Sequence, residues 1–474
     1  MPGRSHGRWN GRVSRTAARG TLMVAATLCI TAAAGAQTIP QPSRTDVQVR
    51  RVMSTATTAN APATRLVKDP RSGTLYYLKR TGGIYQLDPV AGSSAFVYSP
   101  ATHGLNNVQG FTIGGDGTMY LVGNADVPGT RTQATVVKGV PETDGTRTWS
   151  IMARTAPYPK SRTAYDHRLN GMAVDPAGAF LYINSGSRTD HGEVQSVGGL
   201  YPGVREVGLT ACILRLPTSG SDIFLRNNRG WLRNNGYLFA EGTRNTYDMA
   251  FAPNGDLIGP DNGPDRDMPD ELNWLRPGRH YGFPWRIGGL DNPQQVADYD
   301  PAADLLLNPL FNAVRQGYYR NDPTFPPRPA TPLIEPIASV GPHGDSFRDP
   351  ASGALRDASA EGGTISSFTP HRSPLGIVFD TGRVLAAPFR GDGFMLSWTR
   401  GDPVGDGVAG PFRDPGQDLL HLDLTKTGET YRVRATRVVR AFNNPIDAEI
   451  VGNRIYVLDY GGAQDIWEVT LPRG

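Results

Sequence analysis

One pattern recurs six times along the chain and limits the folds available to it. A short apolar strand meets a turn containing Asp, Asn, Pro or Gly, and a second strand follows with Tyr or Leu at alternating positions. The copies are LVKDPRSGTLYYL from Leu66, GFTIGGDGTMYLV from Gly110, GMAVDPAGAFLYI from Gly171, DMAFAPNGDLIGP from Asp248, GIVFDTGRVLAAP from Gly376 and DAEIVGNRIYVLD from Asp447.

The turn composition and the alternation predict a β-hairpin in each copy. Six irregularly spaced hairpins are typical of a β-propeller, in which each hairpin belongs to a four-stranded blade around a central channel. A β-sandwich with repeated hairpins is the alternative, and it accounts less well for six copies of one motif. We therefore expect an all-β fold over residues 66–474, a six-bladed β-propeller with long inter-blade loops.

One interval, residues 290–362, departs from this rhythm and is rich in Pro and Asp. A structureless loop of that length is unusual in a compact domain. We expect an insert there, with some strand content around residues 333–340.

The first 36 residues have the composition of a signal peptide. An apolar run from Thr21 to Ala33 precedes the small-residue site Ala34-Gly35-Ala36, and it is too short to span a membrane. Five arginines come before it: Arg4, Arg8, Arg12, Arg15 and Arg19. We expect cleavage, a polar N-terminal segment over 37–65, and a periplasmic or secreted protein without stable membrane insertion. An uncleaved anchor is the alternative.

The charge and the cysteines narrow the function classes. The chain carries +4 in all, and the leader holds five arginines and no acid, so the remainder carries −1. Without a basic stripe interleaved with aromatics, no nucleic-acid partner is expected. Cys29 lies in the leader, so Cys212 is left without a disulfide partner. Its strand-like surroundings indicate a buried structural thiol.

The stretch from Gly242 to Trp285 concentrates the candidate chemistry. Arg244 and Asn245 precede a strand, and a Gly263-Pro264 turn follows among several acids: Asp261, Asp265, Asp267, Asp270 and Glu271. Ca²⁺ takes six to eight oxygen ligands, including backbone carbonyls, and this loop is rich in them. The alternative is a solvated acidic loop, because loops are generally enriched in Asp, Gly and Pro.

A second candidate precedes the third repeat, where Asp166 and His167 are adjacent. A histidine beside an acid can act as general base with its imidazole oriented by the carboxylate. The alternative is a structural or merely exposed histidine. The sequence has no G-x-S-x-G motif, Walker loop or dinucleotide fingerprint in its structural context. Redox chemistry would therefore need a cofactor other than a dinucleotide.

A Gly-Pro turn, the acids after it, the run Glu271-Leu272-Asn273 and a final Tyr-Gly-Phe-Pro at 281–284 follow one another here. Together they resemble the soluble quinoprotein sugar dehydrogenases, the glucose/sorbosone dehydrogenase family. The similarity runs in order from about Leu66 to Leu471 and is most specific over Arg244 to Pro284. It implies a six-bladed propeller with pyrroloquinoline quinone (PQQ) over the channel, Ca²⁺ beside it, a sugar or aldose substrate and an external electron acceptor.

The resemblance also implies roles for particular residues. His167 would be the general base with Asp166 beside it, and Arg244 would be both catalytic and, with Asn245, cofactor-binding. The remaining positions are Gly263 and Pro264 for the cofactor's Ca²⁺, Asp270, Glu271 and Tyr281 for a structural Ca²⁺, and Asn106 or Gln109 near the substrate.

The sequence departs from the family pattern in the last blade. Glucose-oxidising members have two arginines there that clamp the cofactor carboxylates, whereas this chain reads FNNPIDAEI. Arg390 or Arg400 is expected to compensate. Two other functions remain open: a non-enzymatic Ca²⁺-binding propeller that recognises carbohydrate or protein, and a Ca²⁺-dependent lactonase.

Overall fold

The computed structural model describes residues 39–56, 61–401 and 411–474. The expected signal peptide, 1–36, lies outside the described residues. Six antiparallel blades are present in the described part of the chain, which confirms the predicted six-bladed β-propeller. None of the described helices has the length and hydrophobicity that crossing a bilayer requires.

Each sequence repeat supplies the innermost strand of one blade, and in five of the six it also supplies the second strand. The first three blades are β3 (Ala63–Lys68), β4 (Leu75–Lys79), β5 (Ile84–Asp88) and β6 (Ser93–Tyr98); β7 (Val108–Ile113), β8 (Met119–Val127), β9 (Arg131–Pro141) and β10 (Arg147–Thr155); and β12 (Leu169–Val174), β13 (Phe180–Ser185), β14 (Cys212–Pro217) and β16 (Leu238–Glu241).

The fourth blade has three strands, and the last two blades have four each. They are β17 (Ala250–Phe251), β18 (Leu257–Asp261) and β19 (Glu271–Leu275); β26 (Pro374–Phe379), β27 (Gly393–Ser397), β28 (Leu419–Thr427) and β29 (Thr430–Arg440); and β30 (Pro445–Val451), β31 (Arg454–Asp459), β32 (Asp465–Thr470) and β2 (Gln48–Ser54).

Short elements extend the blades. β1 (Gln41–Pro42) pairs with β29, β11 (Tyr158–Pro159) with β9, β15 (Ile223–Leu225) with β10, and β20 (Arg279–His280) with β16. Two short helices lie in the connections, α1 (Pro100–His103) and α2 (Arg229–Asn234).

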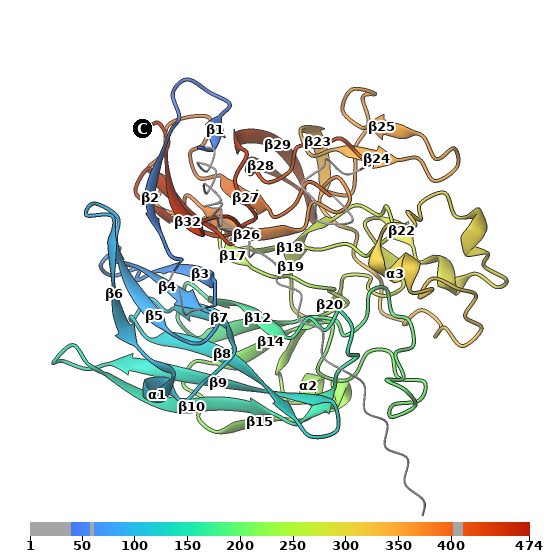
Figure 1. Ribbon diagram of the computed structural model, residues 1–474, viewed down its shortest axis with the longest axis horizontal. Coiled ribbons are helices and arrows are strands. Elements are labelled where there is room, and N and C mark those ends of the chain that lie inside the picture. Colours follow the sequence, from blue (N-terminus) through green and yellow to red (C-terminus); the bar gives the residue numbers. More distant parts are fainter. Residues whose placement is uncertain (1–38, 57–60, 402–410) are drawn as a thin grey trace, which may run out of the picture. The chain divides into compact units, whose positions relative to one another are not determined.

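The ring closes between the first and last blades. The inner strands β3 and β30 contact each other, as do β3 and β7, and β26 and β30. Figure 1 shows the blue first blade beside the red last blade. A cavity of about 240 Å³ lies between the inner strands.

The N-terminal segment differs from its expected structure. Residues 37–65 were expected to precede the propeller as a polar segment, but β2 forms the outer strand of the last blade by pairing with β32. Only weak alternation marks β2, QVRRVMS, and its partner lies more than 400 positions away in sequence. No local sequence pattern therefore predicts this pairing.

The fifth repeat also differs from its expected structure. Its expected second strand is instead a loop organised by Asp380, whose carboxylate accepts the amides of Val384 (2.9 Å), Leu385 (3.1 Å) and Gly391 (3.0 Å). The partner of β26 is β27, which begins at Gly393.

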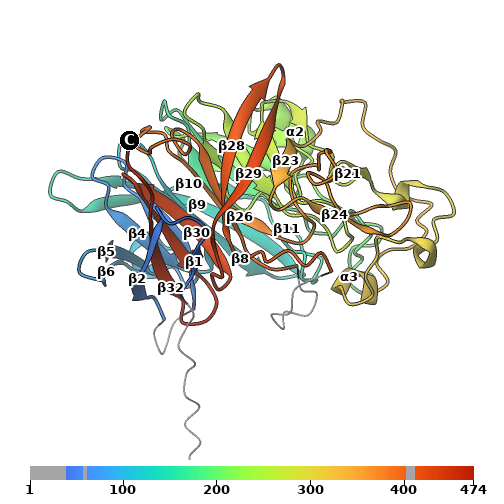
Figure 2. The same ribbon diagram turned by 90° about the horizontal axis from the view of Figure 1, so that it is seen from above.

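The predicted insert follows the fourth blade. Its elements α3 and β24 lie to one side of the blades (Figure 2). Strand content lies within it, as expected around 333–340, in β23, which runs parallel to β29. Its elements and the preceding strand are β21 (Arg286–Ile287), β22 (Leu290–Asp291), η1 (Pro293–Gln295), η2 (Pro301–Ala303), α3 (Asn312–Arg315), β23 (Ala338–Pro342), β24 (Ser346–Arg348) and β25 (Leu355–Asp357).

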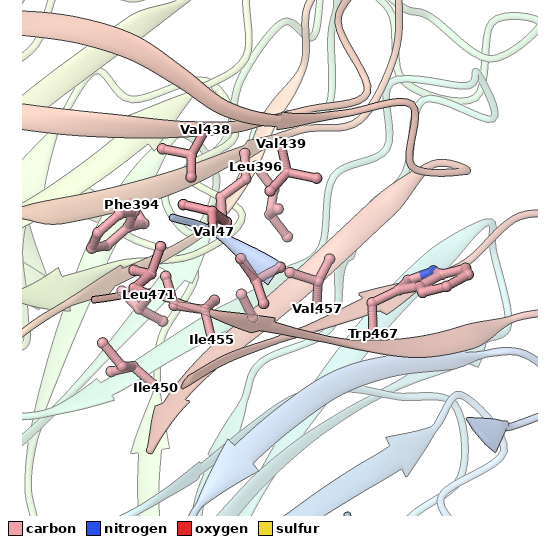
Figure 3. Close-up of a cluster of buried hydrophobic side chains, with 14 of the residues drawn as sticks. Val47, Phe394, Leu396, Val438, Val439, Ile450, Ile455, Val457, Trp467 and Leu471 are labelled. Carbon is pink, nitrogen blue, oxygen red and sulfur yellow. The ribbon is translucent and has the colours of Figure 1, made fainter. Parts of the chain in front are cut away.

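The largest apolar clusters lie where neighbouring blades face each other. Between the last two blades, Phe394 and Leu396 of β27 pack with Ile455, Val457 and Trp467 (Figure 3). Burying such side chains contributes about 1.5–3 kcal/mol each. Cys212 is buried, as expected.

Candidate active site

The six inner strands run in the same direction, because every blade begins at the channel and continues outward. Residues that precede these strands therefore gather at one end of the channel, which we call the site end; loops that follow the strands lie at the far end. His167 precedes β12, Arg244 and Asn245 precede β17, and His371 precedes β26.

Backbone contacts join His167 to Arg244. The His167 amide donates to the Ser187 carbonyl (2.9 Å), and the Ser187 amide donates to the Arg244 carbonyl (2.7 Å). Gly186 lies between the backbone of His167 and that of Arg244. A Cβ at this position would lie only 2.5 Å from the Cβ of His167. Any side chain at position 186 would therefore push the histidine away from the arginine.

The His167 ring is held in one tautomer. Its Nδ1 lies 3.2 Å from the hydroxyl of Ser187, and that hydroxyl donates its only hydrogen to the carbonyl of Thr189 (2.8 Å). The Ser187 oxygen can then only accept from the ring, so Nδ1 carries the hydrogen and Nε2 has a lone pair. Burial, reinforced by the charge of Arg244, lowers the pKa of His167 to about 3.

Asp166 does not orient this ring in the structure, contrary to the expectation. Its carboxylate accepts the amides of Ser161 (2.6 Å) and Arg162 (2.9 Å) and so closes the preceding turn. Backbone amides satisfy the aspartate locally, and the ring turns to Ser187 instead.

Arg244 is buried at the site end and held on three sides. Its Nε donates to the backbone carbonyl of Asp190 (2.7 Å), its Nη2 to the Asp190 carboxylate (2.9 Å), and its Nη1 to the carbonyl of Asn262 (3.2 Å). Burial alone would lower the pKa of Arg244, but the charges of Asp190 and Asp265 outweigh it and raise the pKa. The guanidinium therefore stays charged.

Asn245 belongs to an amide cluster. Its side-chain oxygen accepts from the Nδ2 of Asn170 (3.0 Å), and Asn170 in turn accepts from Asn184 (2.7 Å). The backbone amides of Arg244 and Asn245 both donate to Asp261. The pair is thus fixed on β18, next to the Gly263-Pro264 turn.

The Gly263-Pro264 turn presents oxygen atoms suited to binding a cation. Among the described residues, no hydrogen bond reaches either of the two backbone carbonyls, and the buried Oδ1 of Asn262 also lacks a partner there. The turn is anchored by its amides, since Gly263 donates to Asp270 (2.6 Å) and Asp265 to Asp190 (3.1 Å). Unpaired carbonyl oxygens on a fixed turn match what Ca²⁺ requires.

The side chains expected to hold a structural Ca²⁺ are differently arranged. Asp270 accepts the amides of Gly263 and Ser373 (2.9 Å), so both its oxygens bridge loops. The Tyr281 hydroxyl accepts from the Arg276 amide (2.7 Å). Across the described residues, no three acidic, His or Cys side chains converge as a metal cluster.

Of the three side chains expected at the structural Ca²⁺, Glu271 is the best suited to bind a cation. It faces Asp261 across the β18–β19 pair and accepts from Asn273 (2.9 Å) and from the Gly288 amide (2.7 Å). Burial raises the pKa of Asp261 to about 7, and burial with the charge of Asp261 raises that of Glu271 to about 8. Two buried acids with raised pKa values form a pair that a cation would stabilise.

The expected substrate-side residues lie at the start of β7. Gln109 accepts from the Nδ2 of Asn124 (2.9 Å), which also donates to the Leu169 carbonyl (2.8 Å) just after His167. Asn106 instead lines a cavity of about 420 Å³ with Arg80. Gln109 is thus linked to the β12 segment, whereas Asn106 lies in a hollow lined by residues that precede β3 and β7 or follow β4.

A family model supplies the deciding comparison: the model described as Glucose / Sorbosone dehydrogenase matches residues 61–309, slightly more than half of the chain. The chain belongs to the glucose/sorbosone dehydrogenase family. A search of curated proteins finds no match.

Solved structures agree with this family in fold. The soluble aldose sugar dehydrogenase of Escherichia coli, in its apo form, is 14% identical over 90% of this chain and 99% of its own, with a TM-score of 0.52. The holo PQQ domain of a Coprinopsis cinerea pyranose dehydrogenase is 13% identical over 91% and 98%, with a TM-score of 0.52. A glucose dehydrogenase is 16% identical over 90% and 99%, with a TM-score of 0.53.

The arginines expected to replace the family's cofactor clamp are separated by the fold. Arg390 follows β26, so it lies at the far end of the channel. Arg400 follows β27 at the site end, and its Nε contacts Gln417 (2.9 Å). Arg390 is therefore removed from the candidate site, because the loop that replaces the expected strand carries it away.

Two further groups of residues lie at the site end without a recognisable motif in the sequence. Asp190 and His191 have no metal-ligand spacing in the sequence, yet Asp190 holds Arg244. His371 stacks on Phe311 with ring centroids 4.0 Å apart and contacts Asp267 (2.9 Å). The sequence carries one signal for His371: it precedes the fifth repeat much as His167 precedes the third.

Proposed function

We propose that this member of the glucose/sorbosone dehydrogenase family oxidises a hydroxyl of a sugar or aldose by hydride transfer to PQQ. The observation that carries the proposal is the continuous set of contacts from His167 through Ser187 and Arg244 to Asn262, beside Gly263. It links a base, a permanent cation and unpaired carbonyl oxygens at one end of the channel. The holo PQQ domain of similar fold supports the choice of cofactor.

His167 has the protonation state that a base needs. With Nδ1 hydrogen-bonded to Ser187 and its pKa lowered to about 3, the ring is neutral at physiological pH and its Nε2 can accept a proton. We assign Nε2 to take the proton of the sugar hydroxyl while the hydride leaves from the same carbon. The carbon that bears the hydroxyl would be oxidised by loss of the hydride to a bound quinone, and the proton would remain on His167.

Arg244 and the turn supply the electrostatics. When bound, PQQ accepts the hydride, and Ca²⁺ supplies Lewis-acid polarisation of a quinone oxygen. Arg244 contributes a positive charge held in place by Asp190, and the carbonyls of Gly263 and Pro264 are the ligands we assign to Ca²⁺. Asn245 is a cofactor contact beside Arg244, and Gln109 is a substrate contact on β7.

For a structural Ca²⁺, we assign Glu271 and Asp261 before Asp270, because these two buried acids face each other across β18 and β19 and a cation would stabilise the pair. Tyr281 can contribute only through its backbone carbonyl, because its hydroxyl is engaged by Trp274 and Arg276. We also propose export after removal of residues 1–36, with electrons passing to an external acceptor.

The test is a titration of the purified full chain with PQQ, in CaCl₂ and in EGTA, followed by absorbance as a panel of aldoses and an artificial acceptor dye is added. We expect Ca²⁺-dependent quinone binding and sugar-dependent bleaching of the oxidised quinone. Absence of quinone binding would overturn the proposal.

One observation favours a second candidate, a Ca²⁺-binding propeller without redox activity. Of the two arginines expected to replace the cofactor clamp, Arg390 lies at the far end and only Arg400 remains at the site end. A third arginine at the site end, Arg372, is neutralised by Asp414 and Asp418. The same titration separates the two functions, because this candidate predicts bound Ca²⁺ and no quinone affinity.

A further inference from the structure

The carboxylate that holds Arg244 is itself held by several donors. Asp190 is fully buried, and its Oδ1 accepts from Arg244 (2.9 Å) and from the Asp265 amide (3.1 Å). Its Oδ2 accepts from the Nδ1 of His191 (2.9 Å) and from the hydroxyl of Tyr319 (3.2 Å). Four groups therefore determine where this carboxylate points, and only one of them is Arg244.

His191 and Tyr319 act on Asp190 as one unit. Their rings stack with centroids 3.8 Å apart and an interplanar angle of 15°, and both are buried. A carboxylate can only accept, so Nδ1 of His191 carries the hydrogen. The other ring nitrogen, Nε2, is buried and has no hydrogen-bond partner within the described part of the chain. The ring thus makes its hydrogen bond to Asp190, and Oε2 of Glu193 lies 3.6 Å from the same nitrogen, Nδ1.

Tyr319 comes from a distant part of the sequence. It lies in the 290–362 insert, whereas Asp190 and His191 follow β13 in the third blade. The insert also contacts the loop between β18 and β19, whose Asp265 amide donates to Asp190: the Ala313 amide donates to the Asp265 carboxylate (2.9 Å), and Asp304 pairs with Arg266 (2.8 Å). The insert therefore contacts residues around Arg244 at three points, through Tyr319, Ala313 and Asp304.

We propose that His191 and Tyr319 are positioning residues that fix Asp190, and through it the orientation and effective charge of Arg244 toward an anionic cofactor. This inference rests on the proposed function, because it takes Arg244 as a quinone contact. It gives the insert a role, since the insert supplies one of the two donors to Oδ2.

The physical reason lies in how the charge of Asp190 is shared. A carboxylate bound only to Arg244 would cancel most of that arginine's field in a buried site. Donors on the opposite oxygen draw part of the negative charge away from Arg244 and lock the rotamer of Asp190. Loss of these donors leaves Asp190 free to pair more fully with Arg244, which weakens binding of an anionic ligand.

The test compares His191→Leu, Tyr319→Phe and a matched control, His421→Leu. His421 is also buried, contacts an aspartate, Asp392 (2.8 Å), and packs against aromatic rings, but it lies in the fifth blade. Quinone affinity is measured by calorimetry, kcat and KM with an aldose, and thermal midpoints by circular dichroism. Crystal structures of the ligand-free variants give the separation between Arg244 Nη2 and Asp190 Oδ1.

We expect His191→Leu to weaken quinone binding about tenfold or more, the effect of one charge-assisted hydrogen bond. Tyr319→Phe keeps the ring and should weaken binding by a smaller factor, whereas His421→Leu should lower only the thermal midpoint. Quinone affinity equal to wild type in both His191→Leu and Tyr319→Phe overturns the inference.

The ligand-free structures separate this inference from the proposed function. A displaced Arg244 in His191→Leu, in a protein whose wild type binds no quinone, supports positioning and rejects the quinone. An undisplaced Arg244 in both variants, with wild-type quinone binding intact, rejects positioning and keeps the enzyme.

Discussion

The hydroxyl of Ser187 lies 3.2 Å from Nδ1 of His167 and 2.8 Å from the carbonyl oxygen of Thr189. Because the hydroxyl has one hydrogen and Thr189 takes it, the imidazole must donate to Ser187. A neutral serine thereby fixes the tautomer of His167 without the charge that would raise the pKa of the ring. The base stays unprotonated over a wide pH range.

Replacing Ser187 by alanine should therefore impair the orientation of His167. We expect kcat to fall by roughly five- to tenfold, the equivalent of one net hydrogen bond, with KM little changed. Steady-state kinetics with an aldose and an acceptor dye would measure this. Ser185→Ala is the matched control, because Ser185 is equally buried and donates to Leu209 instead. Equal losses in both variants would count against the tautomer argument.

Replacing His167 by glutamine should lower kcat by about two to four orders of magnitude while quinone binding persists. A variant that turns over at the wild-type rate would show that His167 is not the base. In the wild type, the pKa of His167 near 3 predicts no loss of kcat/KM from titration of this ring between pH 7 and pH 5.

The same histidine should affect stability in acid. Its pKa is about 3 in the folded protein, against an ordinary value of 6.5 for a solvated histidine, so between these values the unfolded chain binds the extra proton. His167 therefore makes stability fall as pH drops from about 6.5 toward 3. We expect His167→Gln to lose less stability than wild type in urea titrations at pH 7 and pH 5. An identical acid dependence would contradict the lowered pKa.

Calcium should stabilise the protein through Glu271. Burial and Asp261 raise the pKa of Glu271 to about 8, so at pH 7 without Ca²⁺ this side chain is protonated and Glu271→Gln is close to isosteric with it. We expect equal thermal midpoints for the two proteins in EGTA. Saturating Ca²⁺, at about 100 times Kd, should add about 2.7 kcal/mol to the wild type and less to the variant.

Scanning calorimetry in EGTA, CaCl₂ and MgCl₂ would check this. Mg²⁺ is the control, because its demand for near-octahedral geometry suits a site of backbone carbonyls and buried acids less well. Equal Ca²⁺ increments in wild type and Glu271→Gln would remove Glu271 from the metal site.

Trp467 should be critical for stability because it lies in the core between the last two blades and is 1% exposed. We expect Trp467→Ala to lower the free energy of unfolding by about 3–5 kcal/mol. Trp231, only partly buried on α2, is the control and should cost less when replaced. Urea unfolding followed by circular dichroism measures both; similar losses would show that the two sites pack alike.

Local sequence patterns were sufficient to predict the propeller. Six hairpin motifs marked the inner strand of every blade, since alternation and turn chemistry are local properties. The sequence also marked Arg244, Asn245 and His167 through motifs that sit directly before those strands. The residues just ahead of inner strands gather at the site end, so a linear pattern was enough to locate them.

The tertiary structure decided which partner each side chain took. Asp166 is adjacent to His167 in sequence but turns to backbone amides, and Ser187, twenty residues away, holds the ring. Likewise β2 finds β32 at the other end of the chain, and Tyr319 reaches Asp190 from a distant insert. Such contacts depend on which donors and strand edges the closed ring leaves within reach, and no local pattern encodes that.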